Sequence, residues 1–164
     1  MKLEPPDTHH FSAAQGWLGL GNLNEALVEL AQLRPVHHEA PEVLELRWQI
    51  LATARRWNEG LATAETLVAR APDCPRGWVH RAVSLYRLGS AQAAFDALAP
   101  ALSRFPRDWV VRYDLACYAC QLDRLTLART WLSEALELGE SERVKNLALE
   151  DPDLQVLWPE IPEY

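Results

Sequence analysis

The residues with the greatest chemical potential are the two cysteines of Cys117-Tyr-Ala-Cys120, because a C-x-x-C pair can act as a redox dithiol or supply half of a zinc site. A redox pair gains its low thiol pKa at a helix N-terminus, whereas the surrounding apolar spacing places both cysteines in the middle of a helix. Zinc needs four ligands, and His80, Asp114 and Cys74 offer no second close pair. We therefore expect thiols that pack as small apolar side chains, and keep a redox or zinc-linked activity at Cys117 and Cys120 as an alternative.

Other candidate groups lack the context that chemistry requires. His9-His10 and His37-His38 are expected near helix ends, as solvated histidines rather than metal ligands. Glu42 and Glu45 are expected in the first turn of a helix, where the helix dipole favours acids, so they are not interpreted as a catalytic pair. The G-x-x-G-x-G run of residues 16–21 is not the dinucleotide fingerprint, and neither a P-loop nor a nucleophile elbow occurs. We predict a protein that is not an enzyme and has no cofactor and no metal site.

The composition is that of a globular chain. One hundred and sixty-four residues, 49% hydrophobic and 24% charged, leave room for a single domain or one short repeat array. Sixteen Lys and Arg against 23 Asp and Glu give a net charge of -7, which repels nucleic acid and anionic membranes, so neither is expected as a partner. The sequence shows no apolar run of signal-peptide or membrane-span length, and three cysteines suit a reducing compartment, so a cytoplasmic location is expected.

Apolar and small residues recur along the chain every 34 residues. Self-similarity at a fixed period of this length is the signature of a repeat architecture. The clearest positions are Ala14, Trp48, Ala82 and Ala116; Ala26, Gly60, Ala94 and Ala128; and Leu30, Ala64, Leu98 and Leu132.

Each repeat is predicted to hold two helices, because apolar residues within it recur at helical spacing. Polar or Gly-containing pairs separate the two helices at 21–22, 55–56, 89–90 and 123–124. Prolines mark the boundaries, since Pro41 and Pro75 suit the first position of a helix and Pro72 and Pro106 follow a helix end. One helix pair cannot bury its apolar faces alone, so we expect the repeats to stack into a right-handed solenoid within a single domain over 1–164. The repeats span 7–40, 41–74, 75–108 and 109–142.

The third repeat shows which family the chain resembles. Its residues fall on the tetratricopeptide pattern W-x2-L-G-x2-Y…A-x3-F…P at Trp78, Arg81, Ala82, Leu85, Ala94, Leu98 and Pro106. The sequence therefore resembles a bacterial tetratricopeptide repeat (TPR) protein, although Arg81, Ala82, Leu85 and Leu98 replace the consensus residues at four positions. The resemblance implies an all-α, right-handed superhelix. The first repeat departs most, because Pro35 precedes the usual proline position, and we expect its second helix to end early.

The chain after the fourth repeat is interpreted as a capping tail over 143–164. Ser141 and Glu142 can start a further helix through Leu149. Asp151 then reads as the N-cap of a short helix that has proline at its first position and runs through Trp158. The tail resembles the terminal helices of bacterial TPR proteins, which cover the exposed apolar face of the last repeat.

The resemblance also implies a binding surface, because the first helix of each TPR unit lines a concave groove. Residues at i, i+4 and i+7 of these helices share that face. The groove passes from a polar, acidic stretch in the second repeat to an apolar, aromatic one in the third and fourth, so an amphipathic ligand is expected, with Tyr86 and Tyr113 as anchors and Arg76 or Arg87 on a carboxylate. The predicted partner-binding residues are Phe11, Gln15, Leu18, Glu45, Gln49, Arg76, Val79, Val83, Tyr86, Arg87, Tyr113, Cys117 and Gln121.

These features predict a protein-interaction scaffold that binds a peptide or helix of another protein in its groove. The Lys and Asn clamp with which some TPR domains hold the acidic tails of heat-shock proteins is missing, because Phe11, Glu45, Gln15 and Gln49 stand in its place. A TPR chaperone of type III secretion is an alternative, since such chaperones are similarly small and acidic. Self-association through the apolar part of the groove is another.

Overall fold

The computed structural model describes residues 3–161 and shows only helices and turns within that range, which confirms the predicted all-α fold. The chain divides into two compact units, with the boundary in the sequence between Ser84 and Leu85. The first holds α1 (Asp7–Gly19), α2 (Leu23–Ala31), the 3-10 helix η1 (Pro35–His37), α3 (Pro41–Thr53), α4 (Trp57–Arg70) and most of α5 (Pro75–Arg87). The second holds α6 (Ala91–Leu98), α7 (Ala101–Arg104), α8 (Trp109–Gln121), α9 (Leu125–Leu138), α10 (Ser141–Glu150) and the 3-10 helix η2 (Pro152–Leu157). None of the helices in residues 3–161 is long and apolar enough to cross a membrane.

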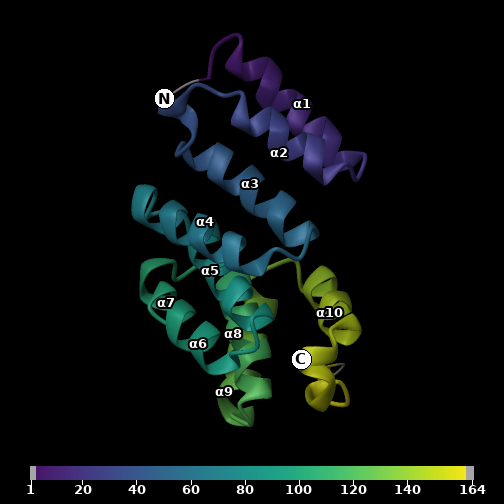
Figure 1. Ribbon diagram of the computed structural model, residues 1–164. Helices are drawn as coiled ribbons and strands as arrows, with labels where there is room; N and C mark the ends of the chain where they lie inside the picture. The colour runs from purple at the N-terminus through teal and green to yellow at the C-terminus, as the bar shows by residue number, and fades with distance from the viewer. Residues whose placement is uncertain (1–2, 162–164) are drawn as a thin grey trace. The chain divides into compact units, whose positions relative to one another are not determined.

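The first unit is built from antiparallel helix pairs, α1 with α2 and α3 with α4, each joined by a short turn (Figure 1). Small residues stand where the partner helices approach, and Ala14, Ala26 and Ala64 are fully buried. Trp48 is a large residue at a repeat position that is otherwise alanine. Gly60 leaves room for it, because the Trp48 indole lies 3.5 Å from the place that a Cβ atom at position 60 would occupy. The core of this unit therefore forms at the residues whose 34-residue spacing predicts the repeat.

The second unit packs α8 against α9 and α6, and ends in the tail. Its repeat positions are again fully buried, at Ala94, Ala116, Ala128, Leu98 and Leu132. Helix α10 packs on α9, and η2 packs on α8. The tail side chains Leu154, Leu157 and Ile161 are fully buried, as expected of a cap, and the Trp158 indole N–H donates to the Ala148 carbonyl at 2.9 Å. Residues 162–164 of the predicted tail lie outside the described part of the chain.

The turn inside each helix pair repeats the same backbone conformation every 34 residues. Gly21 and Gly89 have φ angles of 75° and 97°, and the corresponding Arg55 and Asp123 have φ angles of 56° and 58°. This left-handed region is free for glycine but costs other L-residues about 1–2 kcal/mol. The turns therefore follow the period in geometry even where the residue type changes.

Replacing Arg55 by Gly is expected to stabilise the protein by about 0.5–1 kcal/mol, because glycine removes the steric cost of the left-handed turn and Arg55 is exposed. Thermal unfolding should show a Tm higher by about 2 °C. The matched control Arg56→Gly changes the neighbouring residue, whose φ is -85° and whose guanidinium pairs with Glu59, and should lower or preserve Tm. A Tm for Arg55→Gly below that of the wild type would contradict this account of the turn.

Two helices differ from the pattern of a regular repeat. The apolar spacing of the third repeat predicts one continuous second helix, and the structure divides it into α6 and α7, because Pro100 has no N–H for the helix to continue. Helix α2 ends at Ala31 and is followed by η1, so the predicted early end of the second helix in the first repeat is confirmed.

Candidate functional site

Five of the predicted partner-binding residues line one pocket in the first unit. Phe11 and Gln15 come from α1, Glu45 and Gln49 from α3, and Arg76 from the first turn of α5. The pocket has a volume of about 340 Å3 and also includes Glu42 and Leu46, which were not among the predicted partner-binding residues. We call these seven residues the α1–α3–α5 pocket. Its walls combine two amides, an aromatic ring, an aliphatic side chain and charges of both signs.

The charges of this pocket are partly paired. The Arg76 guanidinium donates to the Glu45 carboxylate, and this contact raises the pKa of Arg76. Glu45 lies in the second turn of α3, so the expectation that the helix dipole explains both acids is wrong for Glu45 and holds for Glu42. Arg76 is 66% exposed and Glu45 only 19%, which leaves the guanidinium accessible at the mouth of the pocket.

Three other predicted residues of the first unit lie outside this pocket. Leu18 packs against the core cluster of α1, α2 and α3, and Val79 and Val83 are half-buried on α5. A polar contact between α3 and α5 was not predicted from the sequence. The Trp48 indole stacks on the His80 ring with 3.7 Å between the ring centres, and its N–H donates to the Ser84 hydroxyl at 2.9 Å. Burial, with the charge of Arg76, lowers the pKa of His80 to about 4, so this ring is neutral at pH 7. The signal in the sequence is Trp48 itself, which occupies a small-residue position.

In the second unit, four predicted residues contact the chain's own tail. The Tyr113 hydroxyl donates to Asp151 Oδ2 at 2.9 Å, and the Cys117 thiol lies 3.6 Å from the same oxygen. The Tyr86 hydroxyl donates to Asp153 Oδ1 at 2.6 Å, and the Gln121 amide donates to the Asp153 carbonyl at 3.2 Å. We call Tyr86, Tyr113, Cys117 and Gln121 the tyrosine face. The remaining predicted residue of this unit, Arg87, is exposed, with its guanidinium 5.9 Å from the centre of the Tyr86 ring.

The cysteine pair does not have the acidified thiols of a redox site. Burial, with the nearby Asp151 carboxylate, raises the pKa of Cys117 well above its ordinary value. Burial also raises the pKa of Cys120 to about 11. Both thiols are therefore protonated at neutral pH, which argues against the redox alternative. For the zinc alternative, residues 3–161 contain no cluster of three or more His, Cys, Asp or Glu placed to hold a metal ion.

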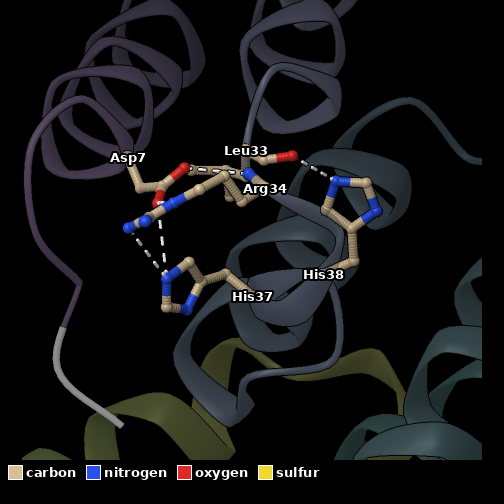
Figure 2. A network of polar contacts seen from close by, with 5 residues as sticks. All are labelled: Asp7, Leu33, Arg34, His37 and His38. Carbon is tan, nitrogen blue, oxygen red and sulfur yellow. Dashed lines mark hydrogen bonds and ion pairs between the residues drawn. The ribbon is translucent and has the colours of Figure 1, made fainter.

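Three histidines take part in polar contacts of the first unit that were not predicted from the sequence. Figure 2 shows the buried Asp7 carboxylate contacting Arg34, whose backbone N–H and Nε donate at 2.8 and 2.5 Å, and His37, whose Nε2 lies at 3.3 Å. His38 Nε2 lies 2.7 Å from the Leu33 carbonyl oxygen, and His10 contacts Glu29. The interpretation of these residues as solvated loop histidines is therefore wrong for His10, His37 and His38, while His9 is exposed as expected but lies in α1. The network fixes the start of α1 to the segment between α2 and α3.

Replacing Asp7 by Asn is expected to lower Tm by several degrees at pH 7. Burial opposes the ionisation of Asp7, but hydrogen bonds from Arg34 and the charges of Arg34 and His37 outweigh it and hold the pKa of this carboxyl below its usual 3.8. An acid with a lowered folded-state pKa stabilises the protein above the unfolded-state pKa, and this contribution is lost as pH falls through the folded-state value. Thermal melts from pH 7 to pH 2 should therefore show the difference between wild type and variant narrowing below about pH 4. A Tm difference between wild type and Asp7→Asn that stays constant from pH 7 to pH 2 would contradict the assignment.

Known proteins resemble this chain in structure rather than in sequence. No protein-family model matches the sequence, and no curated protein matches it significantly. Among solved structures, it is similar to MamA 41-end from Desulfovibrio magneticus RS-1, with a TM-score of 0.73 and 15% identity, covering 99% of this chain and 96% of that one. It is also similar to a thermophilic TPR protein in Thermus thermophilus, with a TM-score of 0.69 and 19% identity, covering 96% of this chain and all of that one. A MamA RS-1 double mutant matches with a TM-score of 0.72 and 14% identity, over 85% of this chain and 79% of that one. Together with the buried 34-residue repeat positions, these matches show that the chain has the TPR fold, an all-α superhelical repeat of helix pairs.

Proposed function

We propose that this chain is a protein-interaction scaffold that captures a segment of a partner protein on the first helices of its repeats, which we call the inner helices. The α1–α3–α5 pocket is its open binding site. The observation that carries the proposal is the pocket itself, to which the first helices of three successive repeats each contribute side chains. A site assembled from rigid helices loses little conformational entropy on binding, which favours recognition of an extended or helical segment.

The chemistry of the pocket describes the segment it fits. Gln15 and Gln49 are exposed amides, which can donate to and accept from a peptide backbone at once. Phe11 and Leu46 offer apolar contact for one side chain of the partner. Glu42, exposed in the first turn of α3, suits a basic residue beside it. The partner segment is therefore amphipathic, with an apolar anchor and an adjacent Lys or Arg.

Affinity capture with two charge-matched variants tests the proposal. Gln15→Arg with Gln49→Arg places two bulky cations in the pocket, while the control Gln32→Arg with Asn58→Arg adds the same charge at exposed positions elsewhere in the first unit. Wild type and control should recover the same partner, and the pocket variant should lose it. A partner retained by the pocket variant would contradict the proposal. A membrane-active protein as that partner would indicate the narrower function of a secretion chaperone.

A further inference from the structure

The tyrosine face holds two carboxylates with uncharged donors. The carboxylates of Asp151 and Asp153 accept from two phenol hydroxyls and a thiol of the tyrosine face, and the Asp153 backbone carbonyl accepts from its amide. Burial, with the neighbouring acidic groups, raises the pKa of Tyr86 and Tyr113 above the ordinary value, so both phenols are protonated and act as donors. A cluster of uncharged O–H and S–H donors is complementary to a carboxylate.

The segment seated on this face has the form of a compact peptide ligand. Asp151 Oδ1 accepts from the Asp153 backbone N–H at 3.0 Å, which closes a turn around Pro152. The turn directs two carboxylates, two residues apart, to donors on α5 and α8. The buried Leu154 and Leu157 follow it and anchor the chain. The four donors lie 32 to 67 positions from their acceptors in the sequence, so the contact is a tertiary docking of the tail on α5 and α8.

We propose that the tyrosine face is a binding site for an acidic Asp-x-Asp turn, filled in cis by Asp151–Asp153, and that a partner protein presenting the same turn competes with the tail. This inference rests on the proposed function and adds a second kind of partner segment to it. The α1–α3–α5 pocket suits a segment with a basic residue, whereas the tyrosine face suits an acidic segment. A ligand tethered to its own site by a short linker acts at an effective concentration of about millimolar, so the competing segment binds the intact chain much more weakly than a chain whose tail is released.

Peptide binding to the full-length chain tests this competition. The probes are a fluorescein-labelled peptide with the sequence of residues 149–158, LEDPDLQVLW, and the same peptide with both aspartates changed to Asn. The tail is weakened by Asp151→Asn with Asp153→Asn. By fluorescence anisotropy, this variant should bind the Asp peptide at least about 10-fold more tightly than wild type does, and at least about 10-fold more tightly than it binds the Asn peptide. Equal affinities in either comparison, or no binding to any chain, would overturn the proposal.

Further variants locate the peptide and separate this inference from the proposed function. Adding Tyr86→Phe and Tyr113→Phe to the variant with Asp151→Asn and Asp153→Asn removes two hydroxyl donors while keeping the rings. This change should weaken binding of the Asp peptide about 10-fold. Adding Gln15→Arg and Gln49→Arg instead should leave that affinity unchanged. If the affinity for the Asp peptide fell only with Gln15→Arg and Gln49→Arg, the assignment to the tyrosine face would be overturned. Loss of the captured partner in the affinity experiment tests the α1–α3–α5 pocket alone, so the two proposals can fail separately.

Hydrogen exchange of the wild-type chain tests the proposal even where the variant with Asp151→Asn and Asp153→Asn does not fold. One millimolar Asp peptide should speed exchange in residues 151–157 at least about 10-fold and leave α3 unchanged, and the Asn peptide should have no effect. Unchanged exchange would show that the tail is a fixed cap and overturn the proposal. Light scattering completes the test, because a wild-type dimer that dissociates on addition of the Asp peptide would show that the ligand is the tail of a second copy.

Discussion

Replacing Ala94 by Asp is expected to destabilise the protein by about 3–5 kcal/mol, the cost of an unpaired buried charge. Ala94 is fully buried on α6, which packs against α8, and it occupies a small-residue position of the 34-residue repeat. The added carboxyl group meets apolar neighbours and no water, and the helices have to separate to hydrate it. Urea unfolding followed by circular dichroism at 222 nm measures the loss, and Tm should fall by about 8 °C or more.

The matched control is Ala62→Asp, which makes the same substitution at an exposed position of α4. A change at an exposed helical site away from special contacts stays within about 0.5 kcal/mol. Equal melting temperatures for the two variants would show that the repeat register assigned to the third repeat is wrong.

Replacing Leu157 by Ala is expected to cost about 2–5 kcal/mol, the range for removing a fully buried leucine side chain. Leu157 is the last residue of η2, and its side chain is fully buried where the tail covers the second unit. The loss should be accompanied by faster hydrogen exchange in residues 151–157, since the same side chain anchors the turn that carries Asp151 and Asp153.

The neighbouring Val156 supplies the control for this change, because its side chain is 52% exposed. Val156→Ala should alter the free energy of unfolding by no more than about 0.5 kcal/mol. If Leu157→Ala were as mild as Val156→Ala, the tail would not be the cap of the second unit.

The 34-residue period predicts the scaffold in detail because it encodes contacts made within a repeat and between neighbours. The repeat positions that include Ala14, Ala26 and Leu30 are the buried positions of the helix pairs. The turn positions between the two helices share a left-handed backbone conformation. Each of these features depends on residues less than one repeat apart. Apolar spacing and turn chemistry therefore suffice to predict them.

The docking of the tail could not be predicted in the same way. Tyr86 and Asp153 are 67 residues apart, and Tyr113 and Asp151 are 38 apart, and neither separation is a multiple of the period. A tyrosine on the first helix of a repeat can contact either a partner protein or the chain's own tail. The sequence around the tyrosine is the same in both cases, so it does not distinguish them. The position of the acidic turn depends instead on how Leu154 and Leu157 fit the core of the second unit.

The polar network of the first unit was missed for a related reason. Asp7 precedes Arg34 by 27 residues, and a single acid at a helix start is explained by the helix dipole without any partner. Two adjacent histidines between helices are typical of a solvated loop, so His37 carried no signal of burial. Its burial follows from η1, which turns the segment between α2 and α3 back onto the start of α1.

Photo-crosslinking from position 49 tests most directly whether partner proteins bind on the inner helices. The photoreactive amino acid p-benzoylphenylalanine replaces Gln49 in the α1–α3–α5 pocket, and Asn58 on the exposed side of α4 in the control chain. After irradiation in source lysate, we predict a covalent adduct with one partner protein from position 49 and none from position 58. Adducts of equal yield from both positions, or an adduct from position 58 alone, would contradict the assignment of the partner to this pocket.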